Sequence, residues 1–155
     1  MRASPHVGLP WLSSVMTLPG KWFSRGRRGP GSASSQQRGR SSERLACAFL
    51  ESRGYQIEAT NVRFPIGELD IVALCDRTLC LVEVRSRGPS EFGSAATSIT
   101  AQKRRRLIRA AQRYLQGRRV PWQADIRFDV VAVDYSPQGA ASIQLIQGAF
   151  TADEW

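Results

Sequence analysis

Two apolar runs that follow one another constrain this fold more than any other feature. The first, Glu-Leu-Asp-Ile-Val-Ala-Leu-Cys, covers residues 68–75, and the second, Thr-Leu-Cys-Leu-Val-Glu-Val-Arg, covers residues 78–85. Both are apolar at successive positions and not only at alternate ones, which is typical of strands buried on both faces. Asp76 and Arg77 between the runs predict a tight turn. We therefore expect a β-hairpin in the middle of a layered domain.

The segments around this hairpin alternate between helical and strand patterns. In chain order we predict a helix from Ser41 or Ser42 to about Arg53, a strand at 55–63, a turn at 64–67, the hairpin, a loop at 86–96, a helix at about 98–116, a strand at 126–134, a turn at 136–139 and a strand at 142–147. Gly54 and Gly117 would end the two helices. This order indicates an α/β fold with a mixed β-sheet flanked by helices.

The hairpin places acidic residues on a shared face. If the turn consists of Asp76 and Arg77 alone, Asp70 lies directly opposite Glu83, whereas a four-residue loop would place Asp70 opposite Arg85. In both registers Asp70, Glu83 and Arg85 lie on one face of the sheet, because side chains alternate with period two. Facing carboxylates about 5 Å apart would repel by roughly 3 kcal/mol at an effective dielectric constant of about 20.

A bound proton, a neighbouring arginine or a divalent cation would offset this repulsion. Mg²⁺ binds one or two carboxylates together with water and substrate phosphate, and it can activate water against a phosphodiester without a histidine. The chain has one histidine, His6, in the N-terminal segment, which argues against serine-histidine and cysteine-histidine catalysis. The alternative is purely structural, with an acid paired to Arg63, Arg85 or Arg87.

The second helix carries a concentration of positive charge. Between residues 102 and 119 there are eight basic side chains and no acid, namely Lys103, Arg104, Arg105, Arg106, Arg109, Arg113, Arg118 and Arg119. A solvent-exposed helix face that binds no ligand would balance such charges with acidic residues at i+4 spacing. The pattern favours a surface that contacts nucleic-acid phosphates, and the scarcity of nearby aromatic residues favours duplex or branched DNA over a single-strand stacking platform.

The formal net charge of +9 comes largely from the N-terminal segment. Residues 1–40 hold seven basic side chains and no acid, in a context rich in Gly, Ser, Pro and Arg. We predict a disordered basic tail at 1–37, one folded domain at 38–150 and a C-terminal tail at 151–155. A transit-peptide-like leader, a start codon placed too far upstream and an electrostatic arm for nucleic acid remain alternative interpretations.

Localisation follows from the cysteines and from the interrupted apolar segments. Cys47, Cys75 and Cys80 match no metal-ligand spacing and lie in apolar runs, which indicates core residues in a reducing, cytoplasmic compartment. The longest run without charge, residues 3–20, is broken by three prolines, so we expect no membrane span and no secretion signal.

Motifs along the folded part resemble those of a known family. Gly-Glu-Leu-Asp-Ile-Val-Ala at 67–73, followed by Leu-Val-Glu-Val-Arg-Ser-Arg at 81–87, is similar to the GEIDLIA…FVEVKxR signature of the YraN-like uncharacterised family. That family is related to Holliday junction resolvases and to PD-(D/E)xK restriction-endonuclease-like nucleases. The resemblance extends over about residues 38–150 and implies a restriction-endonuclease-like αβββαβ core with an extra C-terminal strand.

The resemblance also implies roles for individual residues. Asp70 and Glu83 correspond to the two metal-binding acids, and Glu43 resembles a first-helix glutamate that completes the site. Glu68 and Arg87 are candidate accessory residues. The family's lysine, two positions after the second acid, is Arg85 here, and an arginine keeps the charge but does not release a proton near neutral pH. Lys103 is a candidate to supply the missing ammonium from a neighbouring element.

Together these observations predict an endonuclease-like protein that depends on Mg²⁺ or Mn²⁺ and acts on DNA, duplex or branched. Its catalytic residues would be Glu43, Asp70, Glu83 and Arg85, and its DNA contacts would come from Lys103, Arg104, Arg105, Arg106, Arg109 and Arg113. By analogy, resolvase-like domains also suggest a homodimer. A DNA-binding module that has lost cleavage and a protein-interaction subunit whose basic helix docks on an acidic partner are the alternatives.

Overall fold

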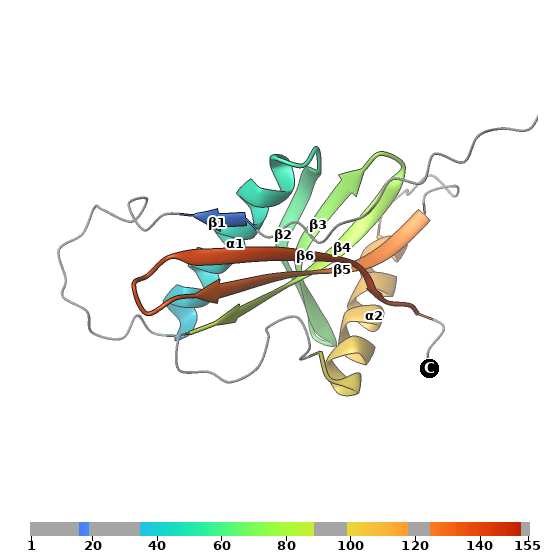
Figure 1. Cartoon of the computed structure of the whole chain (residues 1–155). Helices are drawn as coiled ribbons and strands as arrows, with labels where there is room; N and C mark the ends of the chain where they lie inside the picture. The colour runs from blue at the N-terminus through green and yellow to red at the C-terminus, as the bar shows by residue number, and fades with distance from the viewer. Residues whose placement is uncertain (1–15, 19–34, 89–98, 118–124, 153–155) are drawn as a thin grey trace, which may run out of the picture.

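A computed structural model describes residues 16–18, 35–88, 99–117 and 125–152 of the chain. Six strands form one sheet, with spatial order β1-β6-β5-β4-β3-β2, and two helices pack against it (Figure 1). The elements are β1 (Met16–Leu18), α1 (Ser35–Glu51), β2 (Gln56–Phe64), β3 (Gly67–Cys75), β4 (Thr78–Arg87), α2 (Ala101–Gln116), β5 (Asp125–Tyr135) and β6 (Ala141–Phe150). Strand β4 runs parallel to β5, and the other neighbours are antiparallel. The predicted α/β fold with a mixed sheet is confirmed.

The central hairpin forms as the apolar runs predict. Cys75 pairs with Thr78, so the turn has the two residues Asp76 and Arg77, and Asp76 adopts a positive φ of 54°. Aspartate tolerates this left-handed conformation better than most residues, which suits a tight hairpin turn. Strands β3 and β4 lie between other strands of the sheet, and they contribute core residues to both of its faces.

The two helices cover opposite faces of the sheet. Alternation along β4 assigns Cys80 and Val82 to the α1 side and Leu79 and Leu81 to the α2 side. From α1, the residues Ala46, Phe49 and Leu50 are buried against the first face, and from α2, the residues Leu107, Ala110 and Ala111 are buried against the second. By the same alternation, Glu83 of β4 and Asp70 of β3 lie on the α2 side of the sheet.

Helix α1 begins earlier than predicted. Ser42 lies inside the helix, where its Oγ donates a hydrogen bond to the Arg38 carbonyl at 2.9 Å and contacts the Tyr135 hydroxyl at 3.0 Å. These two partners satisfy a serine that is almost completely buried, so it does not cap a helix end. The other end agrees with the prediction, since Gly54 adopts a positive φ of 84° just beyond the last turn.

The predicted second helix is confirmed, with a later start. The Thr100 side chain accepts a hydrogen bond from Lys103 N and caps α2, which therefore begins at Ala101. Strand β1 lies within the segment predicted as a tail, and its three residues pair with β6. Outside the described residues lie the rest of residues 1–34, residues 89–98, Arg118, Arg119 and residues 153–155. No described helix is long and apolar enough to cross a membrane.

Candidate active site

The hairpin brings Asp70 and Glu83 together, and its backbone pairing stops just before them. The last backbone pair of the β3–β4 ladder is Ile71 with Val82, so the next position in register places Asp70 opposite Glu83. There the Asp70 side chain substitutes for a ladder carbonyl, because its Oδ2 accepts a hydrogen bond from Val84 N at 2.9 Å. The strands therefore separate where the two carboxylates lie.

Glu83 is buried without full compensation. It is only 3% exposed, and its Oε2 has no hydrogen-bond partner among the described residues. Burial, and next the negative charge of Asp70, raise the pKa of Glu83 to about 7. Burial likewise raises the pKa of Asp70, although the hydrogen bond from Val84 and the charge of Lys103 oppose this. The pair thus favours bound protons or a nearby cation, as expected for close carboxylates.

Lys103 of α2 supplies one positive charge to this pair. Its Nζ lies 3.2 Å from Glu83 Oε1, and its side chain is only 28% exposed. The Thr100 cap fixes where α2 begins and so places Lys103 in the first helical turn. Lys103 therefore contacts Glu83, the acid that stands two positions before Arg85 on β4.

Gly67 allows α2 to approach the sheet closely enough for that contact. A Cβ atom added at Gly67 would lie 2.8 Å from the carbonyl oxygen of Arg106 and 3.5 Å from the Cβ of Ala110. The first of these separations is shorter than real carbon–oxygen contacts, so only glycine fits without a shift of the helix. The glycine that opens the Gly-Glu-Leu-Asp motif is thus a positioning residue for α2.

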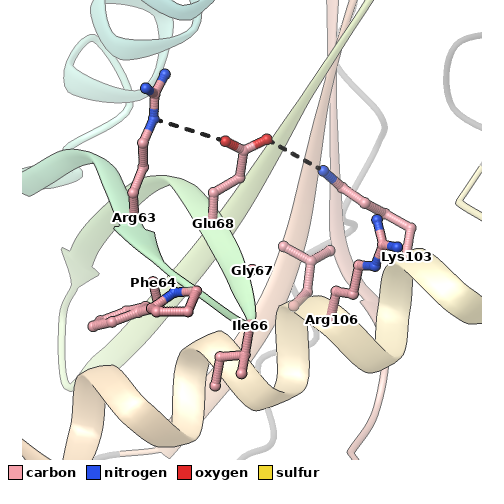
Figure 2. Close-up of a pocket in the computed structure, with 9 residues that line it drawn as sticks. Arg63, Phe64, Ile66, Gly67, Glu68, Lys103 and Arg106 are labelled. Carbon is pink, nitrogen blue, oxygen red and sulfur yellow. Dashed lines mark ion pairs between the residues drawn. The ribbon is translucent and has the colours of Figure 1, made fainter.

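Arg85 and Glu68 lie around the ammonium of Lys103. Arg85 Nη1 is 3.8 Å from Glu83 Oε1, a longer contact than that of Lys103. Glu68 Oε1 is 3.9 Å from Lys103 Nζ, and its other oxygen is 3.9 Å from Arg63 Nε (Figure 2). Lys103 therefore lies between a half-exposed acid and a buried one. Glu68 is thus linked to the acidic pair through Lys103, and its accessory role stays a prediction.

Glu43 is directed to a different partner. Its Oε2 accepts a hydrogen bond from Asn61 Nδ2 at 2.9 Å, and it lines a surface hollow of about 740 Å³ with Arg40, Arg44, Asn61 and Arg63. Within the described ranges, no three His, Cys, Asp or Glu residues are arranged as ligands of one metal ion. The structure thus brings Asp70 and Glu83 together and leaves Glu43 outside that pair.

Asp70 and Glu83 nevertheless fit a hard divalent cation. The side chains of Asp70 and Glu83 would bind a metal through carboxylate oxygens, the ligands that Mg²⁺ prefers. Mg²⁺ needs only one or two protein carboxylates. The buried Glu83 Oε2 without a hydrogen-bond donor is the kind of atom that a cation would satisfy. Lys103 already contacts the other oxygen of Glu83, so it would share this carboxylate with the ion.

The predicted phosphate-binding residues of α2 divide into two groups. Arg105, Arg106, Arg109 and Arg113 are exposed, and the last three form the stripe that their spacing predicts. Arg104 is half-buried, because its Nε donates to the Ile99 carbonyl at 3.2 Å and its guanidinium lies over the Phe150 ring. Arg87 is half-buried on β4, in register with Asp134 of β5.

Sequence reasoning missed two groups of residues. Arg40 and Arg44, which are four positions apart on α1, meet Arg63 of β2 in the hollow around Glu43, and no spacing signal links the two elements. On the α1 side of the sheet, Asp129 is completely buried and receives two hydrogen bonds from the Arg127 guanidinium, at 2.7 and 2.8 Å. This second group is a satisfied structural ion pair, in contrast to Glu83.

Comparison with known proteins shows extensive similarity to one group. The profile of the uncharacterised protein family UPF0102 matches residues 42–133. A UPF0102 protein of Symbiobacterium thermophilum is 42% identical over 120 residues, covering 76% of this chain and 99% of the relative. UPF0102 proteins of Verminephrobacter eiseniae and Pseudomonas aeruginosa are 46% and 43% identical, covering 76% and 77% of this chain and 81% and 96% of their own lengths.

Proposed function

The chain belongs to the uncharacterised protein family UPF0102, and from this premise we propose that it is a metal-dependent endonuclease acting on DNA phosphodiesters. The observation that carries the proposal is the buried carboxylate of Glu83, beside Asp70, with a lysine ammonium at 3.2 Å and one oxygen without a donor. Two acids and a lysine are the residue types of the resolvase-like motif that the sequence resembles. Here the lysine comes from α2.

Each residue of this set has a distinct role in the proposal. Asp70 and Glu83 would hold Mg²⁺ or Mn²⁺. When bound, such an ion supplies an activated water and neutralises charge on the phosphate under attack. Lys103 would place a positive charge at the same phosphate, and its contact with Glu83 holds the ammonium there before substrate binds. Arg85 adds a second, more exposed charge for the neighbouring backbone.

The exposed arginines of α2 would position the DNA. Arg106, Arg109 and Arg113 form one stripe on the helix that also carries Lys103. Such contacts fix the backbone without reading bases, which suits recognition of duplex or branched DNA by shape. We place this activity in the cytoplasm, where the free thiols of Cys47, Cys75 and Cys80 would stay reduced. A homodimer that cuts paired strands belongs to the same proposal.

A cleavage panel tests the function. Linear, flapped and four-way DNA would be incubated with the wild type and with Asp70→Asn, in Mg²⁺, in Mn²⁺ and in EDTA. We expect cleavage that needs a divalent cation and disappears in Asp70→Asn, because the amide removes a metal-binding charge and leaves the fold intact. Equal cleavage in EDTA, or unchanged cleavage by Asp70→Asn, would refute the proposal.

A second candidate is a DNA-binding module of the same fold that does not cut. It is favoured by the position of Glu43, which binds Asn61 and does not join the acidic pair, and by Arg85 at the position of the motif lysine. This candidate predicts salt-dependent DNA binding without cleavage in any metal. Arg85→Lys would then either restore cutting or exclude the arginine as the defect. If the protein retained no DNA even at low salt, a protein-interaction subunit would be favoured instead.

A further inference from the structure

A pocket of about 470 Å³ lies beside the acidic pair, between the β2–β3 turn and helix α2. One wall consists of the turn residues 64–68 together with Arg63, and the other consists of Lys103, Arg106 and Leu107 (Figure 2). Lys103 belongs both to this pocket and to the contact with Glu83. Whatever occupies the pocket is therefore next to the proposed reaction centre.

The tip of the turn is apolar and exposed to solvent. Ile66 is 46% exposed, and Pro65 beside it is exposed as well. Among the described residues, Ile126 is the only other large aliphatic side chain with comparable exposure, also 46%, and it does not line the pocket. Proline and isoleucine are residue types that proteins insert between stacked bases.

Charges around the apolar tip are suited to a nucleic-acid backbone. Arg63, Lys103 and Arg106 contribute three positive charges to the lining, and Glu68 is its one acid. Glu68 lies 3.9 Å from both Arg63 and Lys103, and the charged side chains of the lining together leave a positive excess. The pocket thus offers an apolar surface for a ring and a positive rim for the phosphates on either side of it.

We propose that this pocket receives one unpaired nucleobase of DNA, with Pro65 and Ile66 forming an apolar wedge against the stack. A volume of about 470 Å³ is within the range of small-ligand pockets, about 300–1,000 Å³, and is ample for one base. Extruding a base costs least where it is already unpaired. The pocket therefore selects DNA with an unpaired base beside the phosphate to be cut, an inference that rests on the proposed function and specifies its substrate.

Binding assays in EDTA test this inference without interference from cleavage. The probes are one duplex with a single unpaired 2-aminopurine and the same duplex fully paired, each titrated with the full chain. Wild-type protein should bind the first about tenfold more tightly than the second, the effect of one base contact. The 2-aminopurine fluorescence should rise on binding, because the base leaves the stack.

Substitutions at the two equally exposed isoleucines provide the matched comparison. Ile66→Ser should remove the preference for the unpaired base and the fluorescence rise, while affinity for the paired duplex stays unchanged. Ile126→Ser should leave both properties at their wild-type values, and Ile66→Phe should retain the preference because the ring also stacks. Both sites are exposed, so thermal unfolding should be unaffected and will show that each variant is folded.

The result that overturns the inference is distinct from failure of the proposed function. Equal affinity for the two duplexes, or a preference that survives Ile66→Ser, overturns the base pocket even if the protein cuts DNA. Conversely, a preference lost only in Ile66→Ser supports the pocket even if the cleavage panel finds no activity. Failure to bind either duplex overturns both.

Discussion

The Nζ atom of Lys103 lies 3.2 Å from Glu83 Oε1, although the two residues are on different elements and 20 positions apart in sequence. Arg85, which shares the strand with Glu83, lies farther from the same oxygen, at 3.8 Å. In our proposal, Lys103 of α2 takes the role of the motif lysine that β4 lacks. Its position depends on the Thr100 cap and on the close approach of α2 to Gly67.

Substitutions of Asp70 should separate its charge from its hydrogen bond. Asp70→Asn keeps an acceptor for Val84 N and removes the repulsion with Glu83, so the metal-free protein should be stabilised, by up to about 3 kcal/mol. Asp70→Ala leaves that N–H without its acceptor and should cost about 1–3 kcal/mol relative to Asp70→Asn. Urea denaturation at pH 8 in EDTA measures both. Equal free energies of unfolding for the two variants would contradict this interpretation.

Glu83 should make the metal-free protein less stable as the pH rises. Its pKa is raised from 4.5 to about 7, so between these values the folded protein retains a proton that the unfolded chain has lost. The raised pKa of Glu83 adds to the free energy of unfolding. This addition is complete below the pKa of the unfolded chain and is lost as the pH rises through 7, and each unit of difference between the two pKa values corresponds to about 1.4 kcal/mol.

Glu83→Gln is the control for this pH dependence. The amide does not titrate, so the difference in unfolding free energy between pH 5 and pH 8 should shrink in the variant, and the variant should be the more stable protein at pH 8. Thermal and urea unfolding in EDTA at several pH values provide the measurement. An identical pH profile for the two proteins would show that Glu83 does not titrate in this range.

Gly67 should tolerate no side chain. Gly67→Ala brings a Cβ to 2.8 Å from the Arg106 carbonyl oxygen, so α2 must shift, at a cost of about 1–3 kcal/mol. Gly39→Ala in α1 is a matched control, because nothing lies within 4 Å of its added Cβ and alanine favours the helix by up to about 1 kcal/mol. Chemical denaturation compares them, and a neutral Gly67→Ala would contradict the close packing.

The sequence predicts the core elements of this fold for identifiable physical reasons. Continuous apolar runs of this length are typical of central strands, which the structure confirms. The sequence leaves two hairpin registers open, and the structure has the one with the two-residue turn, which brings Asp70 to Glu83. The buried face of α2, with Leu107 and Ala111, follows in the same way from the helical spacing of its apolar residues. Local signals failed at Ser42, which looks like a helix cap but is buried against Tyr135.

Arginines on α2 should determine the salt dependence of DNA binding. Arg106 and Arg109 are exposed, and each would release counterions by contacting a phosphate. Replacing both with glutamine should weaken the salt dependence: the slope of the logarithm of the binding constant against the logarithm of the salt concentration should become less negative by about 2 for any DNA sequence. Fluorescence anisotropy at several salt concentrations provides the slopes. An unchanged slope would place the DNA on another surface.

Contacts between distant segments account for what the sequence does not predict. The sequence names Lys103 as a candidate to supply an ammonium to the acids, but it does not predict the close packing of α2 on Gly67 that accompanies the contact of Lys103 with Glu83. The pairing of Glu43 with Asn61 has the same character, because it joins α1 to β2. The resemblance to the YraN-like family places Glu43 with the acids, but in this structure its carboxylate is directed to an amide.

The most direct test of the account is the single-turnover rate of DNA cleavage by Lys103→Gln relative to the wild type, in Mg²⁺. Arg105→Gln, measured with enzyme in excess so that all DNA is bound, is the matched control. Arg105 is an exposed base two positions along the same helix, and the loss of a DNA-positioning contact does not lower a rate measured at saturation. We expect a loss of about 100-fold or more for Lys103→Gln, the usual effect of removing one group that stabilises transition-state charge, and little change for the control. Wild-type cleavage by Lys103→Gln would contradict the claim that this lysine replaces the one missing from β4.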